Sequence, residues 1–561
     1  MNKAFAELLG QHRDGTIGGA KRGFNSLRQR GPDKLQFWLI ALVIGIVAGL
    51  AAVGFRLSIV WLQELVYGAN DETLASHATK LHWTMIVLIP VFGGLVVGLI
   101  LQRFTPDGRA QSVSHVIEGA ALREGRVDIR SGLASSCAAL ITLCTGGSTG
   151  REGPVVHIGA LISSKVSNFI HADGVTGREL MGCAAAAAVS ASFNAPIAGA
   201  LFALEVVLRH FAVHAFAPIV IASVAGTVVS RLFVGDITEF VVPTHTLAFY
   251  VELPAFMLLG LICGAVAALL IWAIFTTEDL ADVAHDASGL PGWARPMLAG
   301  GALGVIAIFF PHIIGVGYET TSSALTGELL LWQAIVFAII KTIAVAITIA
   351  GRMGGGVFSP SLMMGALTGL AFGMIATAIF PTVSGTVGLY ALAGMGAVAA
   401  AVLGAPISTT LIVFELTGDW QTGLAVMVTV SLSSALCSRL IDRSFFLAQA
   451  ERRDVHLAAG PQEYLMATIA VGRVMRLRGG DKSASDTQSL ELIEQKVFLV
   501  PTDTLEKALP MYDRASVDFI PVIAAPPSED GGAELLGAVF HIDALKAYNR
   551  ALAATAREEH S

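Results

Sequence analysis

The chain has 561 residues, of which 54% are hydrophobic and only 14% are charged, with 36 Lys and Arg against 43 Asp and Glu. Soluble domains carry about 25% charged residues, so most of this chain cannot face water. The composition therefore predicts a multi-pass integral membrane protein embedded in a lipid bilayer. A formal net charge of −7 without long blocks of like charge excludes a nucleic-acid-binding protein.

Charged residues are unevenly placed along the chain. Residues 451–561 hold 29 of them, about a quarter of that segment. We therefore expect an N-terminal arm at residues 1–35, a transmembrane domain at 36–455, and a soluble domain with its tail at 456–561. Seven Lys and Arg precede the first apolar run, so the positive-inside rule places the arm, and with it the tail, in the cytoplasm.

The sequence offers no catalytic or metal-binding set. The five cysteines lie in apolar stretches without the close pairs that zinc or redox motifs need, so we expect buried side chains. No nucleophile and base combination lies in the spans. We expect neither an enzyme nor a protein with a metal or cofactor.

Four apolar runs are long enough to cross a hydrocarbon core of about 30 Å. They cover residues 37–55, 83–101, 253–277 and 329–350. Lys341 interrupts the last run, where a lysine either snorkels or faces the protein interior.

Elsewhere the apolar segments are short and broken by Gly and Pro. The breaks lie at residues 146–154, 194–196, 353–360 and 404–406. Irregular backbone within a membrane is tolerated only where protein buries it or where it lines a polar cavity. These breaks are therefore candidate site positions.

The breaks recur with a constant offset. The Ala-Pro-Ile stretch that leads to Glu205 begins 210 residues before the one that leads to Glu415. Pro154 and Pro360 are each followed, five residues later, by Gly-Ala-Leu. We interpret this as an internal duplication, whose paired broken segments place a transport site at the interface of the repeats. The alternative is two unrelated, closely packed helices rich in small residues.

The most informative break is residues 146–154, Gly-Gly-Ser-Thr-Gly-Arg-Glu-Gly-Pro. Proline favours the first turn of a helix, and a helix start directs free N–H groups and a positive dipole end at one point, where an anion binds. Glu152 sits there, so we expect its carboxylate to compete with an anion and act as a gate; alternatively, it only caps the helix. The matching break directs the N–H groups of Val357 and Phe358 at the same anion.

These motifs resemble the CLC family of chloride channels and proton/chloride exchangers, across roughly residues 35–455. The resemblance implies an all-α polytopic membrane protein with two inverted repeats and broken helices. It also implies a homodimer that moves chloride, with protons in the exchangers, and we expect it in the plasma (cell inner) membrane. Glu152 matches the family's external gating glutamate. The anion-binding positions are Ser112, Gly153, Val357, Phe358 and Phe446, and the helix starts are supported by Gly150, Arg151, Pro154, Gly355, Gly356 and Pro360.

Two anion-binding positions depart from the family pattern. Ser112 falls on the chloride-coordinating serine, but the surrounding Gly-Ser-Gly-Ile-Pro motif is degraded, so Ser114 competes and a simple helix-capping serine is the alternative. A serine here goes with chloride preference in the family. Phe446 falls on the inner tyrosine and lacks its hydroxyl; alternatively, it is an ordinary lipid-facing or core phenylalanine.

The third departure concerns protons. Exchangers of the family usually carry an internal proton-transfer glutamate immediately after the position of Glu205, and here that residue is Val206. We therefore expect channel-like chloride flow, with a proton/chloride exchanger that uses another internal route as the alternative. A fluoride or other-anion transporter and a non-transporting membrane sensor are weaker alternatives. Glu205 and Glu415 are possible auxiliary acids, although helix packing is their more common role in the family.

The C-terminal segment alternates strand-like and helix-like pieces between residues 471 and 550. It is similar to a single CBS motif and predicts a small α/β domain. Asp543 matches the nucleotide-binding aspartate, but Phe540 replaces the expected hydroxyl residue. We therefore expect a structural or dimer-supporting domain that does not bind nucleotide.

Overall fold

The computed structural model describes residues 34–560 apart from 72, 212, 237–250, 456–465, 467–468, 481–482, 496, 516 and 525–533. The chain divides into two compact units, a large helical one that ends at Val455 and a small one formed mainly by the residues after it. The predicted N-terminal arm lies almost entirely outside the described residues. Each unit is considered by itself.

The first half of the helical unit runs from α2 to α10. Its helices are α2 (Lys34–Tyr67), α3 (Leu74–Ala78), α4 (Trp83–Phe104), α5 (Val113–Leu122), α6 (Ile129–Cys144), α7 (Glu152–Ile170), α8 (Gly174–Phe193), α9 (Pro196–Phe202), the π-helical turn η1 (Ala203–Leu208) and α10 (Val213–Val234).

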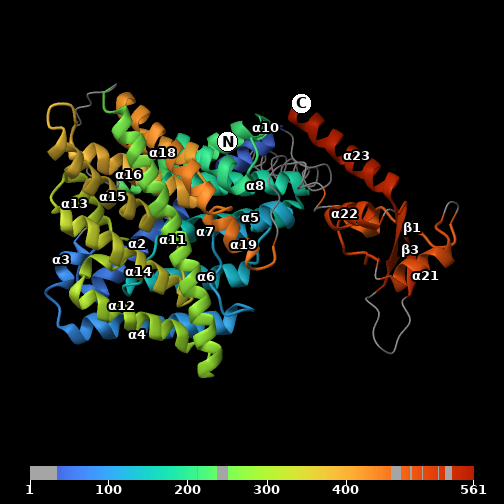
Figure 1. Ribbon diagram of the computed structural model, residues 1–561, viewed down its shortest axis with the longest axis horizontal. Coiled ribbons are helices and arrows are strands. Elements are labelled where there is room, and N and C mark those ends of the chain that lie inside the picture. The colour runs from blue at the N-terminus through green and yellow to red at the C-terminus, as the bar shows by residue number, and fades with distance from the viewer. Residues whose placement is uncertain are drawn as a thin grey trace, which may run out of the picture. The chain divides into compact units, whose positions relative to one another are not determined.

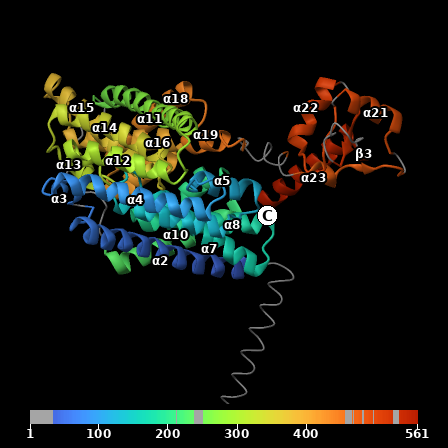
Figure 2. The ribbon, with the colours of Figure 1, turned by 90° about the horizontal axis from the view of Figure 1, so that it is seen from below.

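The second half repeats part of this order, a short helix, three longer ones, a short one and a long one, as in α5 to α10. It comprises α11 (Leu253–Ser288), α12 (Ala294–Phe309), the 3-10 turn η2 (Pro311–Ile313), α13 (Tyr318–Thr326), α14 (Leu331–Ala350), α15 (Phe358–Ile379), α16 (Val387–Leu403), α17 (Pro406–Thr417), α18 (Trp420–Leu440) and α19 (Phe445–Glu451). Helices α4 and α12, one from each half, lie side by side, as do α15 and α16 (Figures 1 and 2).

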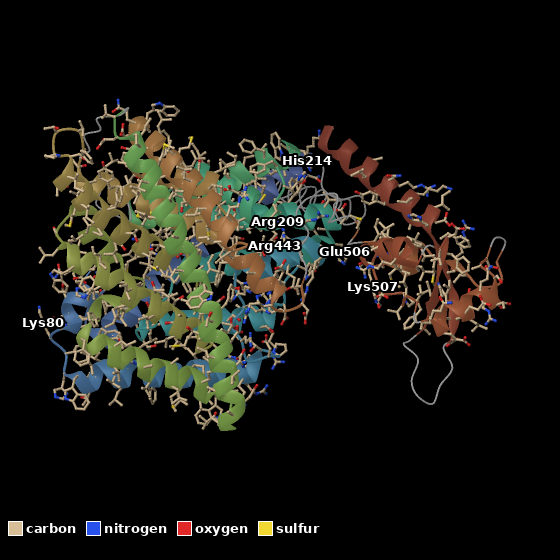
Figure 3. All side chains as sticks on the ribbon, viewed as in Figure 1. Lys80, Arg209, His214, Arg443, Glu506 and Lys507 are labelled. Carbon is tan, nitrogen blue, oxygen red and sulfur yellow. The ribbon has the colours of Figure 1, made fainter. Side chains whose placement is uncertain are left out.

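The predicted spans fall in α2, α4, α11 and α14. In the described part of the chain, seven helical segments are long and apolar enough to cross a membrane. Lys80, beside α3, and Arg443, before α19, lie near opposite ends of the helical unit (Figure 3). Lys341 faces the protein interior, because its side chain is fully buried.

One expectation about cysteine is wrong. Cys144, Cys183, Cys263 and Cys437 are buried, but Cys137 is exposed. It lies one helical turn after the exposed Leu133 on α6, so both residues belong to a face of the helix that the protein does not cover.

Two short contacts relate the halves to each other. The carboxylate of Glu205 in η1 accepts hydrogen bonds from the N–H groups of Ile407 (2.9 Å) and Ser408 (2.7 Å) at the start of α17. Glu415 in α17 accepts from Ile197 (3.0 Å) and Ala198 (2.8 Å) at the start of α9. Each half thus caps a broken helix of the other, as two repeats related by a two-fold axis would.

The small unit is α/β. It contains the 3-10 turn η3 (Val471–Arg473), β1 (Arg476–Leu477), α21 (Asp486–Glu494), α22 (Leu505–Ala515), β2 (Phe519–Ile523), β3 (Leu535–Phe540) and α23 (His541–His560). The antiparallel sheet has the order β1-β3-β2. Its apolar core includes Ile520, Val539 and Tyr512, whose buried hydroxyl donates to the carbonyl of Val539 (2.9 Å). Glu506 and Lys507 lie at the start of α22 (Figure 3).

Candidate functional site

The starts of α7 and α15 meet in the interior of the helical unit. Gly150 and Gly356 form an antiparallel bridge, in which each N–H donates to the other's carbonyl at 2.7 and 2.9 Å. A Cβ atom on Gly355, whose φ is +147°, would overlap the side chain of Thr149. A Cβ atom on Gly153 would lie 3.2 Å from the Cα of Gly356. Only glycines allow this approach, which brings two predicted breaks together.

Both helix starts carry N–H groups without an intrahelical acceptor. Glu152 is the first residue of α7, and Val357 and Phe358 are the N-cap and first residue of α15. Pro154 and Pro360 lie in the first turns, as predicted. Because the first N–H groups of a helix have no partner within it, two positive dipole ends are available to an anion here.

Glu152 lies at this junction with its side chain buried, only 3% exposed. Its Oε1 accepts hydrogen bonds from the hydroxyl of Ser359 (2.5 Å) and from the phenol of Tyr318 (3.1 Å). Its Oε2 has no hydrogen-bond partner among the described residues. The carboxylate therefore has one oxygen fixed by two donors and one that is not held, which is compatible with a group that can leave.

Arg151 and Phe358 contribute differently from the backbone donors. The guanidinium Cζ of Arg151 lies 4.7 Å from the centre of the Tyr318 ring, so the arginine supports the phenol that contacts Glu152. The ring of Phe358 packs on Phe193 at 4.8 Å between centroids. The aromatic side chain is thus a core residue, and only the backbone of Phe358 is available to an anion.

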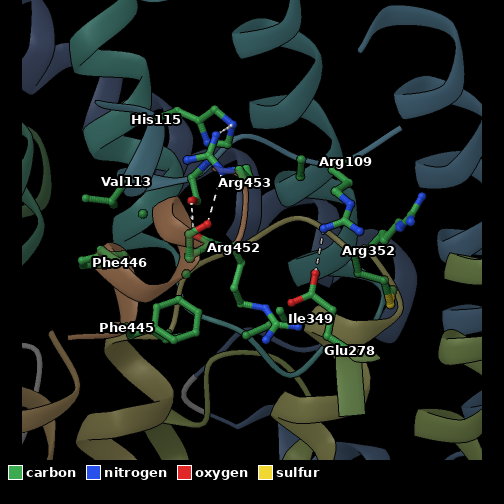
Figure 4. A pocket seen from close by; sticks show the side chains of 18 of the residues that line it. Arg109, Val113, His115, Glu278, Ile349, Arg352, Phe445, Phe446, Arg452 and Arg453 are labelled. Carbon is green, nitrogen blue, oxygen red and sulfur yellow. Dashed lines mark hydrogen bonds and ion pairs between the residues drawn. The ribbon is translucent and has the colours of Figure 1, made fainter. Parts of the chain in front are cut away.

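A cavity of about 70 Å³ reaches the helix starts from the side of α5 and α19 (Figure 4). Its lining includes Ser112, Gly153, Gly355, Gly356, Val357 and Phe446, which the sequence predicted for the anion site. Figure 4 shows Phe445 and Phe446 on the left of this inner cavity and Arg109 with Arg352 on the right. The structure therefore brings together residues that are up to 334 positions apart in sequence.

Ser112 is both a cap and a cavity residue. It is the N-cap of α5, and its hydroxyl donates to the Oε1 of Gln449 (2.6 Å). Ser114 is fully buried and hydrogen-bonds the Nη2 of Arg453 (3.1 Å) without lining the cavity. Of the two serines, Ser112 is the one that lines the cavity, and its hydroxyl proton is directed at Gln449.

Phe446 is buried and packs edge to face on Phe445. It lines the cavity, and its burial also fits the alternative of an ordinary core phenylalanine. Because phenylalanine has no hydroxyl, this wall is apolar where the family pattern supplies a donor.

Val206 is buried within η1, next to Glu205. The carboxylates of Glu205 and Glu415 are both occupied by helix starts of the opposite half, and Ser408 adds a hydroxyl donor to Glu205 (2.7 Å). Both acids therefore act as caps of helix starts in the opposite half.

The sequence does not predict the two hydroxyl donors to Glu152 or the charged residues that line the cavity. Ser359 lies within the predicted break at residues 353–360. By contrast, nothing in the sequence around Tyr318, beyond two preceding glycines, indicates that it contacts Glu152. The cavity is also lined by arginines, each of which is paired with an acid: Arg109 with Glu278 (3.0 Å), Arg352 with Asp282 (3.2 Å), Arg453 with Glu118 (3.2 Å), and Arg452 with Asp279.

Broken helices of two related halves that converge on a buried glutamate define a membrane anion-transport fold. Residues 93–438 match the family described as voltage gated chloride channel. The chain therefore belongs to this family, the CLC proteins.

Two relatives are similar to this chain over most of its length. A ClcB-like chloride channel protein of Ralstonia nicotianae is 32% identical over 394 residues, which cover 69% of this chain and 90% of the relative. The H(+)/Cl(−) exchange transporter ClcA of Cronobacter sakazakii is 29% identical over 449 residues, 76% of this chain and 94% of the relative. The crystal structure of a eukaryotic CLC transporter superposes with a TM-score of 0.65 at 18% identity, covering 91% of this chain and 98% of that chain, which shows the fold.

Proposed function

We propose that this chain carries chloride across the membrane along a path through the inner cavity and past Glu152. One observation carries the proposal: the carboxylate of Glu152 is held where the starts of α7 and α15 meet, next to a cavity that Gly153 and Val357 line. A carboxylate in that place occupies a position suited to an anion, so chloride can pass only when the side chain leaves.

For the mode of transport we propose passive, channel-like flow gated by Glu152. Valine at position 206 cannot take up a proton, and Glu205 next to it is engaged by the start of α17. A proton/chloride exchanger is the second candidate, because a relative at 29% identity is described as an H(+)/Cl(−) exchange transporter. It would need a proton route that avoids Val206.

We further propose a homodimer, embedded in the plasma (cell inner) membrane with both termini in the cytoplasm. Ile197 and Ile407 follow the helix starts that the two glutamates cap, and both side chains are exposed, as an apolar dimer interface requires.

For the small unit we propose a CBS-like domain that does not bind nucleotide. Its Asp543 is engaged by the Nε of Arg476 (2.6 Å), whose guanidinium also covers the ring of Phe540.

The test is chloride efflux from liposomes that contain the purified protein, with external pH recorded. The proposal predicts gradient-driven chloride efflux that moves no protons, and continued efflux for Glu152→Gln. Protons driven uphill by a chloride gradient, and lost in Glu152→Gln, would establish the exchanger instead. No efflux from either protein would favour a non-transporting membrane sensor.

A further inference from the structure

The segment of residues 313–318 places Tyr318 against the gate. Gly317 has a φ of +93°, and Tyr318 is the first residue of α13. The phenol of Tyr318 donates to Glu152, so the position of this short segment decides whether that hydrogen bond forms. What holds the segment therefore bears on the gate.

Lys341 of α14 holds this segment through hydrogen bonds to its backbone. Its fully buried Nζ donates to the carbonyls of Ile313 (3.3 Å), Gly315 (3.1 Å) and Val316 (3.5 Å). An ammonium group can satisfy three acceptors, so one side chain fixes three of the four carbonyls before Gly317.

Two further contacts restrict the segment. The carboxylate of Glu319 accepts hydrogen bonds from the N–H groups of Ala75 (2.8 Å) and Ser76 (3.1 Å) at the start of α3. A Cβ atom on Gly317 would lie 2.5 Å from the sulfur of Met363 and 3.3 Å from the Nζ of Lys341. The backbone next to Tyr318 is therefore packed between α14 and α15, and Lys341 is one of the side chains it packs against.

We propose that Lys341 is a positioning residue of the gate, which keeps the phenol of Tyr318 within reach of Glu152 and so sets how firmly the gate stays closed. The proposal rests on the proposed function. Without the ammonium, three buried carbonyls lose their donor and the segment relaxes toward other partners. The phenol then withdraws, and the carboxylate of Glu152 keeps only Ser359 as a donor.

The experiment compares chloride efflux from liposomes for wild type, Tyr318→Phe, Lys341→Met and the double variant. A hydrogen bond to a charged group is worth enough to change gate opening about tenfold, so Tyr318→Phe should raise efflux about tenfold. Lys341→Met should raise it to a similar extent. In the Tyr318→Phe background, Lys341→Met should have no further effect, because the lysine acts through the phenol.

Thr342→Val is the matched control, since Thr342 follows Lys341 on α14 and its hydroxyl contacts Ala338 and Met364, neither of which belongs to residues 313–318. If Lys341→Met does not fold, Glu319→Gln removes part of the other anchor and should raise efflux only while Tyr318 is present. If Lys341→Met raises efflux by the same factor in the wild-type and Tyr318→Phe backgrounds, or leaves efflux unchanged, the proposal for Lys341 is wrong. If wild type and Glu152→Gln both lack efflux, the proposed function fails and this inference fails with it.

Discussion

At the scale of single residues, the gate that we propose is defined by what surrounds one carboxylate. Glu152 is buried, and the hydroxyls of Ser359 and Tyr318 donate hydrogen bonds to one of its carboxylate oxygens. An unpaired buried carboxylate would be costly, so these donors stabilise Glu152 in the buried position that the structure shows. Weakening them should favour departure of the side chain.

Ser359→Ala tests this directly. The variant removes the 2.5 Å hydrogen bond and should favour opening by about 1.5–3 kcal/mol, which raises chloride efflux from liposomes by roughly tenfold or more. Ser361→Ala is the control, because the hydroxyl of Ser361 bonds the carbonyl of Val357 within α15 and is not one of the described donors to Glu152. Unchanged efflux in Ser359→Ala would mean that the closed position does not limit transport.

The sequence predicted Glu152, Val357 and the flanking glycines because their chemistry lies within short motifs. It did not predict Tyr318, which reaches Glu152 across 166 positions through the tertiary fold. The hydrogen bond between Ser112 and Gln449 could not be predicted either, because the two residues are 337 positions apart. Local patterns identify helix starts, whereas contacts between distant side chains follow only from packing.

At the scale of elements, the broken helices are the device that places N–H groups in the interior. Each break needs something to satisfy the exposed helix start, and α9 and α17 obtain it from Glu415 and Glu205 of the opposite half. The offset of 210 residues predicted the duplication, but not that the acids would serve each other's helices. The exchange follows from the way the fold brings the starts of α9 and α17 next to the acids of the opposite half.

We expect Glu205→Ala and Glu415→Ala to destabilise the protein to a similar extent. Loss of a helix cap costs about 0.5–2 kcal/mol, and both acids accept from two backbone N–H groups. Thermal unfolding in detergent measures the effect, with Glu64→Ala at an exposed position of α2 as the control. Lost transport in a Glu205 variant of unchanged stability would instead assign that acid to the proton or anion path.

At the scale of the whole helical unit, two halves of like helix order enclose one small polar region. The bridge between Gly150 and Gly356 joins them where α7 and α15 begin. The cavity with Ser112 and Phe446 lies against this junction, and it ends in a region of paired charges such as Arg109 and Glu278. Sequence predicted the membrane fold and the junction, while the charge pairs at the cavity required the structure.

We propose that chloride binds between Ser112 and the backbone donors of Val357 and Phe358. Anomalous diffraction from crystals grown in bromide measures this directly, because bromide replaces chloride and is located by its scattering. We predict a bromide peak in the inner cavity of the wild type, and a second peak in Glu152→Gln where the carboxylate lay. Bromide bound only beside the cavity arginines, with none at the starts of α7 and α15, would contradict the account.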